Sequence, residues 1–445
     1  MDETTPDTGQ PDNQPRPALA DLTDGGAEGA GGGRHGVRRW QIIVAVVVLV
    51  ALVAGIAVAV SRRTGTNDQV STATTVATAG SASTEPSGGA STTTTVAADV
   101  GTWSLIPAGP NPPGQPVAWT GTELLVTRAG CCGDLGSDDF SAYDPATKTW
   151  RQLPPTPLTG RSSSAGAWTG TQMIVAGGLT SPDGYDMNMA PAADGAVWTA
   201  AANTWRPIAA MPTPLVVDAS VWTGQEMLVW SADPDTVLAY KPATDTWRSL
   251  PPSGLSPRHA PVAVWTGTDF VVWGGVDTGS NTASSDGARL DPATGTWRPL
   301  PTAPVPARAR AAAVWSGHEV LVWGGDTGGA NPAGTPVGQG VAYDPVTDTW
   351  RALPLSPLRA KVSPAGVWTG RFFLVIGGRA GGGFPVPGPG SAAYDPATNT
   401  WTTLPTAVAY PPLEDGATGP TGPADQRSGG LAVWTGTSAL VVGGQ

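Results

Sequence analysis

Apolar residues recur along the chain in short segments that are separated by turn residues. A typical unit opens with "VAVWTGTDFVVWGG" (262–275), in which two apolar segments flank a Thr-Gly turn and end in a glycine pair. This pattern predicts two antiparallel strands. A segment such as "AYDPAT" (142–147) predicts a third strand that enters an Asp-Pro turn, and "TW" followed by "LP" predicts a fourth. The pattern therefore predicts a repeat of four strands per unit.

Two series of tryptophans show how often the unit recurs. The first series precedes the turn between the first two strands and comprises Trp119, Trp168, Trp222, Trp265, Trp315, Trp368 and Trp434. The second lies in the fourth strand and comprises Trp103, Trp150, Trp205, Trp247, Trp297, Trp350 and Trp401. A four-stranded unit that recurs about every 50 residues is typical of a β-propeller. We expect both series to pack between blades rather than to form a sugar-binding array.

These motifs resemble the kelch-repeat family, specifically the bacterial kelch proteins that are grouped with the galactose oxidase central domain. The resemblance rests on Tyr143-Asp144-Pro145 through Trp150 and on glycine pairs at 177–178, 274–275, 324–325, 377–378 and 443–444. It covers residues 93–445 and implies an all-β, seven-bladed kelch-type propeller. Two units depart from the pattern, with "VWTAAANTW" at 197–205 and "WSA" at 230–232.

The two ends of this region predict how the ring closes. The chain ends after only two strands of its last unit, whereas "GTWSL" (101–105) is a fourth strand without a unit of its own. The preceding "TTTVAAD" (93–99) is a candidate third strand. We therefore expect a closing blade that combines both ends of the chain, because this arrangement removes a free sheet edge.

The first hundred residues divide into three segments. Residues 1–39 are rich in Pro, Gly and Asp and are expected to be a disordered tail. Residues 40–60, "WQIIVAVVVLVALVAGIAVAV", carry no charge and are long enough for a transmembrane helix. Residues 61–92 form a Ser/Thr-rich linker, which leaves 93–445 for the propeller. Cleavage after the "AVA" near the end of the apolar segment is the alternative to an uncleaved anchor.

Arginines on either side of the apolar segment predict its orientation. Arg34, Arg38 and Arg39 precede the segment, and Arg62 and Arg63 follow it. The positive-inside rule then predicts a single-pass protein of the cell membrane with a cytoplasmic N-terminus and an extracytoplasmic propeller.

The formal net charge is −11, so we expect no nucleic-acid partner, because that binding needs a cationic surface. The abundance of Arg, Ala, Gly and Pro is associated with a high-GC bacterial genome.

The lengths of the connections distinguish the two faces of the predicted propeller. The turns between strands 1 and 2 and between strands 3 and 4 are short and lie on one face, here called the turn face. The other connections lie on the opposite loop face and include four long segments at 180–195, 326–340, 379–391 and 406–426. Variable loops on a rigid frame often carry function, so the loop face is the predicted binding face. The alternative is that these loops are tolerated insertions.

Cations recur on the loop face, seven residues before the first-series tryptophans. They are Arg161, Arg258, Arg308, Lys361 and Arg427, and Pro112 and Leu215 are the exceptions. One interpretation is a positive mouth that binds an anionic ligand. The other is that each cation pairs with a loop Asp or with backbone carbonyls. Asp218, four residues before Trp222, is either a ligand-contacting or catalytic acid or the partner of Arg161 or Arg258.

The chain shows no motif for a metal or another cofactor. The resemblance to galactose oxidase raises the question of a copper site. In that enzyme the copper needs several His and Tyr ligands and a Tyr joined to Cys. Here His259 and His318 are predicted on opposite faces, so they cannot converge on one metal, and we expect no copper oxidase activity. Tyr143, Tyr240, Tyr343 and Tyr394 are third-strand residues of the repeat. The acidic residues are scattered, whereas glycoside hydrolysis needs a pair at a defined separation.

The sequence thus favours a non-catalytic, membrane-anchored module of the cell envelope that binds an anionic ligand, a glycan or an envelope protein. A carbohydrate-active enzyme on the loop face and a purely structural envelope protein are the alternatives.

Cys131 and Cys132 are the only cysteines and lie in a loop-face connection between Gly130 and Gly133. An oxidising compartment favours a vicinal disulfide between them. Free thiols, a bond to another molecule or a soft-metal chelate are the alternatives.

Overall fold

The computed structural model describes residues 57–61, 101–107, 109, 113–128, 139–181, 188–329, 334–380, 389–407 and 429–443. The chain separates into two compact units, Met1–Ile43 and Val44–Gln445, and every described residue belongs to the second. The described residues form β-strands that are joined by turns and loops. Among them, no helix has the length and apolar character needed to cross a membrane.

Seven four-stranded antiparallel sheets, here called blades, contain most of the described residues. Blades 1 to 3 comprise β3 (Pro113–Trp119), β4 (Leu124–Arg128), β5 (Phe140–Asp144) and β6 (Thr149–Gln152); β8 (Ala165–Trp168), β9 (Gln172–Ala176), β12 (Gly195–Thr199) and β13 (Thr204–Pro207); and β14 (Ala219–Trp222), β15 (Met227–Ala232), β16 (Asp235–Lys241) and β17 (Thr246–Leu250). Blades 4 to 6 comprise β19 (Val262–Trp265), β20 (Phe270–Trp273), β22 (Gly287–Asp291) and β23 (Thr296–Pro299); β24 (Ala312–Trp315), β25 (Val320–Trp323), β26 (Gly340–Asp344) and β27 (Thr349–Ala352); and β28 (Ala365–Trp368), β29 (Phe373–Ile376), β30 (Ser391–Asp395) and β31 (Thr400–Thr403).

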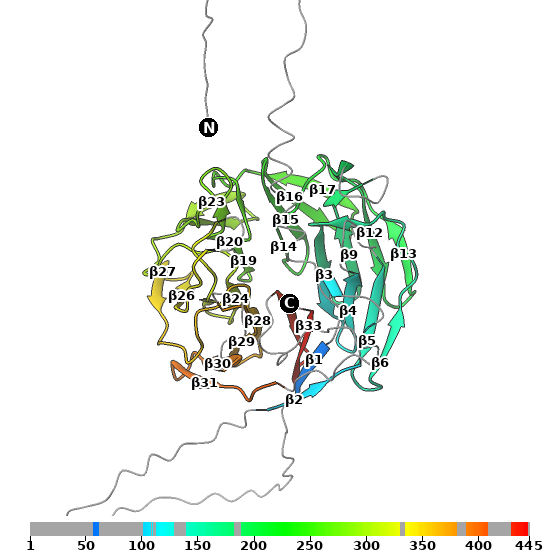
Figure 1. The fold of residues 1–445 in the computed structure, drawn as a ribbon. Coiled ribbons are helices and arrows are strands. Elements are labelled where there is room, and N and C mark those ends of the chain that lie inside the picture. Colours follow the sequence, from blue (N-terminus) through cyan, green and yellow to red (C-terminus); the bar gives the residue numbers. More distant parts are fainter. Residues whose placement is uncertain are drawn as a thin grey trace, which may run out of the picture. The chain divides into compact units, whose positions relative to one another are not determined.

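Blade 7 combines strands from both ends of the second unit. Its order is β2 (Thr102–Leu105), β1 (Ala57–Ser61), β33 (Ser438–Gly443) and β32 (Gly430–Trp434). Two small ribbons lie among the connections, one of β7 (Arg161–Ser162), β10 (Leu179–Thr180) and β11 (Ala190–Pro191), the other of β18 (Arg258–His259) and β21 (Val276–Asp277). The blades surround a common axis, with first strands such as β14, β24 and β28 near the centre and fourth strands such as β13 and β27 at the rim (Figure 1).

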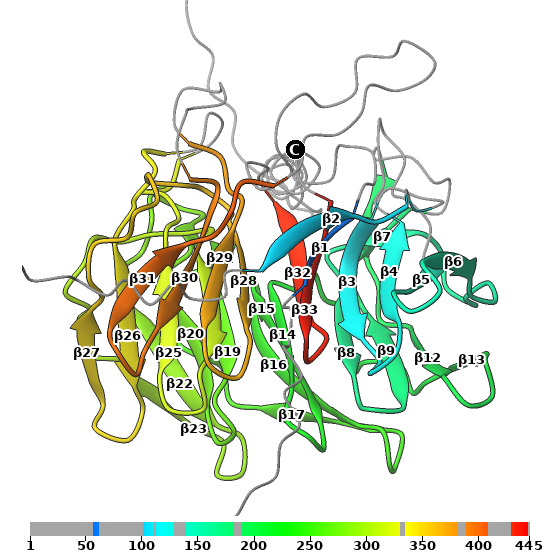
Figure 2. The same ribbon diagram turned by 90° about the horizontal axis from the view of Figure 1, so that it is seen from below.

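Contacts between the innermost strands show that the ring is closed. Each of β3, β8, β14, β19, β24, β28 and β32 contacts the innermost strand of both neighbouring blades, including β32 with β3. In blade 7, Val60 pairs with Trp103, and Ala59 pairs with Leu440. Figure 2 shows β1 and β2 beside β32 and β33, which come from the other end of the sequence. The prediction that both ends combine in one sheet is therefore confirmed.

The identity of the third strand in blade 7 differs from the sequence-based prediction. Ala57–Ser61 occupies the position that we expected for residues 93–99, which lie outside the described residues. The sequence "AVAVS" places β-branched valines at alternate positions, and such residues suit a strand. Its first four residues also belong to the apolar segment 40–60, for which the sequence predicts a transmembrane helix. Residues 40–56 lie outside the described residues, so for them the helix stays a prediction.

Among the described residues, seven hydrophobic clusters hold neighbouring blades together, and each draws residues from two adjacent blades. Between blades 2 and 3, for example, Ile174 packs in one cluster with Met227 and Leu238. Each cluster also contains one tryptophan of the first series and one of the second. The prediction that both tryptophan series pack between blades is therefore confirmed.

The fourth-strand tryptophans also form a regular hydrogen bond that the sequence pattern did not reveal. Each indole Nε1–H donates to a backbone carbonyl of the preceding blade, at distances of 2.7 to 3.1 Å. The acceptors are Pro405, Pro107, Pro154, Ala209, Pro251, Pro301 and Pro354, for Trp103, Trp150, Trp205, Trp247, Trp297, Trp350 and Trp401 respectively. The segment after the fourth strand of one blade, which is "LP" in five of the seven cases, thus binds the "TW" strand of the next.

The structure also explains how blade 2 tolerates its departure from the repeat. In blades 3 and 5, the hydroxyls of Tyr240 and Tyr343 donate to the carboxylate five residues later, at 2.7 and 2.6 Å. Blade 2 has Trp198 at the tyrosine position, and its Nε1–H donates to the Asn203 side chain at 3.2 Å. The aromatic side chain therefore still bonds across the turn between the third and fourth strands.

Candidate functional site

Four of the five cations of the predicted mouth lie among the described residues, and the side chains of all four are buried. Arg161 and Arg258 have fully buried guanidinium groups that form bidentate ion pairs with Asp194 and Asp286. The Nη1–Oδ1 distances are 2.9 and 2.8 Å. Arg258 holds the pKa of the Asp286 carboxyl below its usual range, chiefly through this hydrogen bond. These two cations are therefore neutralised within their own blades.

Arg308 and Lys361 are also buried, and both donate to backbone carbonyls. Arg308 Nη1 donates to the carbonyls of Gln339 at 2.6 Å and Gly324 at 3.2 Å. Burial lowers the pKa of the Arg308 guanidinium to about 10, and its buried Nη2 has no partner among the described residues. Lys361 Nζ donates to the Gly390 carbonyl at 2.7 Å.

These cations belong to a connection that also uses the glycine pairs. The Arg161 and Arg258 guanidinium groups donate to the first glycine of the pair in their own blade, Gly177 or Gly274. The second glycine donates its amide to the following blade, as Gly275 does to the Arg308 carbonyl at 2.9 Å. A Cβ atom on Gly178 would lie 2.5 Å from a neighbouring backbone oxygen, so the close approach requires glycine.

The prediction of an open positive mouth is therefore corrected for Arg161, Arg258, Arg308 and Lys361. Their side chains are buried, and their hydrogen bonds join strands within the propeller. The structural role of these cations also explains why blade 3 has Leu215 instead of a cation at this position. Blade 3 has "WSA" instead of a glycine pair, and β15 and β16 form a tight hairpin, so there is no long connection for an arginine to hold. Arg427 and Pro112 lie outside the described residues.

Asp218 has neither of its two predicted partners. Its Oδ2 accepts the amide of Ala232 at 2.8 Å, and its Oδ1 lies 3.1 Å from His259 Nδ1 in blade 4. The expected pairing with Arg161 or Arg258 is wrong, because both guanidinium groups turn toward the carboxylates of their own blades. Asp218 instead closes the hairpin of blade 3 and holds an imidazole at the loop face.

The structure reveals a loop-face residue that sequence reasoning missed. Five residues before the first-series tryptophan, Ser163, Ala260, Arg310 and Ser363 adopt a positive φ. Their backbones link neighbouring blades, for example through the Arg310 amide and the Ala260 carbonyl at 3.1 Å. Arg310 has the only long side chain of these four. The arginine at a position where the other three blades have Ser or Ala was the sequence feature that could have identified this residue.

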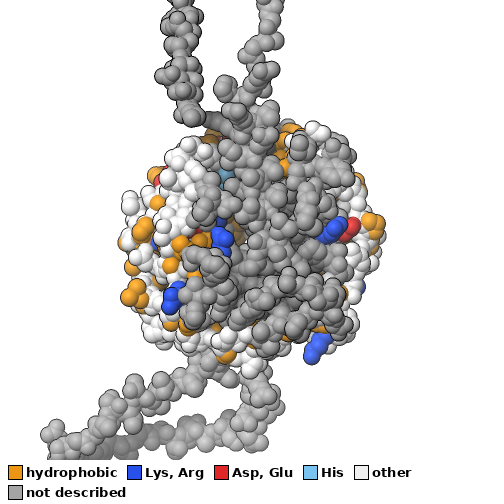
Figure 3. Space-filling model, viewed as in Figure 1, with side chains coloured by type: hydrophobic (Ala, Val, Ile, Leu, Met, Phe, Trp, Pro, Cys, Tyr) orange, Lys and Arg blue, Asp and Glu red, His pale blue; other side chains and the backbone are white. Residues whose placement is uncertain are grey.

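Arg310 is held by a carboxylate that is completely buried. Its Nε and Nη2 donate to the two oxygens of Asp326 at 2.7 and 2.6 Å. The side chain of Arg310 remains 14% exposed and that of His259 remains 21% exposed. His259 immediately precedes Ala260, so the two basic side chains lie on either side of one hydrogen bond between blades 4 and 5. Figure 3 shows basic side chains reaching the surface of this face.

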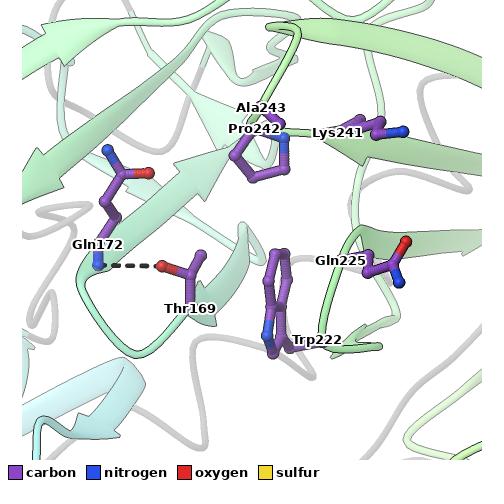
Figure 4. Close-up of a pocket in the computed structure, with 8 residues that line it drawn as sticks. Thr169, Gln172, Trp222, Gln225, Lys241, Pro242 and Ala243 are labelled. Carbon is purple, nitrogen blue, oxygen red and sulfur yellow. Dashed lines mark hydrogen bonds between the residues drawn. The ribbon is translucent and has the colours of Figure 1, made fainter.

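A cavity lies on the opposite, turn face of the propeller, where the sequence predicted no site. Its volume is about 560 Å³, and it lies between the turns of blades 2 and 3. The lining includes Thr169 and Gln172 from blade 2 and Trp222, Gln225, Lys241 and Pro242 from blade 3 (Figure 4). These groups can form hydrogen bonds, apolar contacts and one charged contact with a ligand.

The remaining candidate residues are placed as follows. His318 lies in the turn between β24 and β25, whereas His259 lies on the loop face. Across the described ranges, no cluster of three or more His, Cys, Asp or Glu side chains has a geometry suited to a metal. Cys131 and Cys132 lie outside the described residues, so their vicinal disulfide stays a prediction. An intact mass lower than the reduced mass by two hydrogen atoms would support it.

Comparison with known proteins identifies the family. The model of the KLHDC2/KLHL20/DRC7 Kelch-repeats domain matches residues 217–444, just over half of the chain. The chain therefore belongs to the kelch-repeat family, as the sequence motifs indicated. The solved structure of YjhT is similar to this chain with a TM-score of 0.51 and 15% sequence identity, over 67% of this chain and 99% of YjhT. At this identity the likeness concerns the fold alone. No curated protein matches the chain in sequence.

Proposed function

We propose that this protein is a non-catalytic binding module that uses the loop face of a seven-bladed, ring-closed propeller to hold an acidic segment of a partner protein. Membership of the kelch-repeat family supports a protein-binding role. The observation that carries the proposal is the pair of basic side chains at the loop face, His259 and Arg310, each held by a carboxylate. Such side chains are oriented before a ligand arrives, which lowers the cost of binding.

The chemistry of this pair favours an anionic ligand. Nε and Nη2 of Arg310 are engaged by Asp326, which leaves Nη1 to donate to a carboxylate. His259 adds a second nitrogen donor at the loop face. Both oxygens of Asp218 already accept hydrogen bonds or contact His259, so the alternative of a hydrolase that uses Asp218 as its acid receives no support.

A binding experiment with the full chain in detergent tests the proposal. The probe is a fluorescent ten-residue oligoglutamate, and anisotropy measures its dissociation constant at two salt concentrations. A double variant, Arg310→Ser with Asp326→Val, restores the pattern of other blades, because Ser163 and Val276 occupy the equivalent positions. It also avoids leaving a buried carboxylate without its partner. We expect binding to weaken by about tenfold and its salt dependence to fall.

The matched control is Arg206→Ala on the turn face, whose exposed side chain lies 3.7 Å from Asp245. This variant should bind the probe as the parent chain does. Equal affinity in the Arg310→Ser/Asp326→Val variant would exclude the loop-face basic pair as the binding site. Absence of probe binding by the parent chain would also reject the proposal.

We also propose that residues 40–60 anchor the propeller to the cell membrane, with the N-terminus in the cytoplasm. The proposal is supported by the uncharged length of the segment and by the arginines that flank it. It entails a competition, because β1 uses Ala57–Ser61 in blade 7. In the anchored chain, residues 93–99 would take the third-strand position instead. The partner would then be extracytoplasmic, such as an envelope protein.

Truncation and protease digestion test this anchor. A chain that begins at residue 62 lacks both the apolar segment and β1, and it should remain monomeric and fold cooperatively if residues 93–99 complete blade 7. Aggregation of this chain would assign the third strand to β1, because blade 7 would then have an open edge. Protease added to intact cells should digest the propeller and leave the N-terminal tail protected. A protected propeller would reverse the orientation.

A further inference from the structure

The cavity on the turn face differs from the rest of the repeat in the residues that line it. It is formed by the turn between β8 and β9, the turn between β14 and β15, and the start of the turn after β16. Each of these turns has counterparts in other blades. The repeat therefore provides an internal reference for what a purely structural residue looks like at each position.

Gln172 replaces an acidic residue that other blades use for a structural ion pair. At its position, Glu123 pairs with Arg151, Glu226 with Arg248 and Glu319 with Arg351, with distances of 2.6 to 2.7 Å. In blade 2, the Gln172 Nε2–H donates to the Thr199 hydroxyl at 3.2 Å. The carboxylate is absent from this position, and the amide oxygen of Gln172 remains available.

Lys241 replaces an aspartate that other blades use to form the turn after the third strand. Asp144, Asp291, Asp344 and Asp395 each accept the amide of the residue two positions later, at 2.8 to 3.0 Å. A lysine cannot accept such a bond. Blade 3 thus exchanges a structural anion for a cation at the edge of the cavity.

Gln225 is the third departure, because most blades have threonine at its position. Among the described residues, no hydrogen bond engages the Gln225 carboxamide, the Lys241 ammonium or the Trp222 indole N–H. In contrast, the fourth-strand tryptophans all donate to carbonyls. These three polar groups are therefore free to bind a ligand.

The charge around the cavity is slightly positive. Glu226 forms an ion pair with Arg248 at 2.7 Å, so the two charges cancel. The pKa of Glu226 lies below its usual range, first because of the Arg248 hydrogen bond and in part because of the Lys241 charge. Lys241 therefore adds one positive charge that the neighbouring ion pair does not cancel.

We propose that this cavity is a glycan-binding site for a sugar that carries a carboxylate or another acidic group. The half-buried Trp222 and Pro242 offer an apolar surface to the flat face of a sugar ring, and the two glutamines and Thr169 offer several hydrogen bonds to hydroxyls. Lys241 supplies the counter-charge for the acidic group. The volume of about 560 Å³ suits a ligand of two or three sugar units. This site is independent of the loop-face basic pair.

Variants that restore the repeat test the proposal with little risk to folding. Lys241→Asp and Gln225→Thr each introduce the residue that other blades carry at the same position. The probes are tri-galacturonate, a hyaluronan tetrasaccharide, neutral maltotriose and a tetraglutamate peptide, titrated calorimetrically into the full chain in detergent. We expect Lys241→Asp to weaken binding of the acidic sugars by at least about tenfold, because an attractive charge becomes repulsive. Gln225→Thr should weaken acidic and neutral sugars alike, by about threefold.

Thr268→Gln in blade 4 is the matched control, because it places a glutamine in an equivalent turn away from the cavity. It should leave sugar binding unchanged. The proposal is overturned if neither acidic sugar binds the parent chain at millimolar concentration, or if Lys241→Asp binds both as the parent does. Equal or tighter binding of tetraglutamate, lost in Lys241→Asp, would assign the cavity to an acidic peptide instead. Each variant's unfolding midpoint, measured in parallel, separates lost binding from lost structure.

Discussion

Replacing Arg258 by alanine should destabilise the propeller by about 3 kcal/mol. The guanidinium is fully buried and donates to Asp286 at 2.8 and 3.2 Å, to the Gly274 carbonyl at 3.2 Å and to the Ser256 carbonyl at 2.9 Å. Breaking a buried ion pair typically costs about 3 to 5 kcal/mol. The Asp286 side chain is 62% exposed, so water would solvate its carboxylate, and we therefore discount that cost. The two carbonyls that lose a donor add about 1 kcal/mol each.

Two further variants set the scale for this measurement. Arg258→Lys should lose about half as much stability as Arg258→Ala, because Lys361 shows that a lysine at this position reaches a carbonyl, whereas an ammonium lacks the forked donors of a guanidinium. Arg206→Ala removes an exposed side chain that lies 3.7 Å from Asp245, and it should cost less than about 0.5 kcal/mol. Urea unfolding, followed by tryptophan fluorescence, measures all three changes.

An Arg258→Ala variant that keeps its stability but loses ligand binding would support the interpretation of the loop-face cations as a binding site. If Arg258→Ala unfolds within about 0.5 kcal/mol of the parent chain but loses binding to oligoglutamate, Arg258 serves a ligand and not the fold. The urea midpoint and the anisotropy titration thus separate the two roles with one variant.

Three further substitutions follow from the same connections. Gln339→Asp should stabilise the chain by about 1 kcal/mol, because it offers a carboxylate to the buried, unpartnered Nη2 of Arg308, and a lower urea midpoint would contradict this. Gly178→Ala should cost clearly more than Gly170→Ala, since both have positive φ but only the first would place a Cβ 2.5 Å from a backbone oxygen; similar midpoints would refute the packing argument. Backbone amides lower the pKa of Asp277 from 3.8 to about 2, so its contribution is present above pH 3.8 and is lost as the pH falls through about 2. Asp277→Asn should therefore flatten the acid limb of the stability curve between about pH 4 and pH 2, and an unchanged limb would count against it.

Much of the fold could be predicted because its signals are local. The Thr-Gly and Asp-Pro turns, the alternating apolar segments and the two tryptophan series each lie within one four-stranded unit. Such signals act over a few residues and depend little on distant parts of the chain. The sequence by itself therefore determined the β-class, the four-stranded unit, the two faces and the packing of tryptophans between blades. It also indicated that the first and last parts of the repeat region share one sheet, because each part supplies only some strands of a unit.

The partners of the polar side chains were decided by the tertiary structure. The Trp350 indole binds the Pro301 carbonyl, and Asp218 meets His259, although these residues are 49 and 41 positions apart. Such contacts form only when neighbouring blades pack side by side. The sequence offers several possible donors for each acceptor, and the folded structure decides which of them is buried beside it. For the same reason, the sequence placed a ring of cations at the loop face but could not tell that they turn inward. The turn-face cavity likewise arises because turns of blades 2 and 3 approach each other, which happens only when these two blades pack side by side.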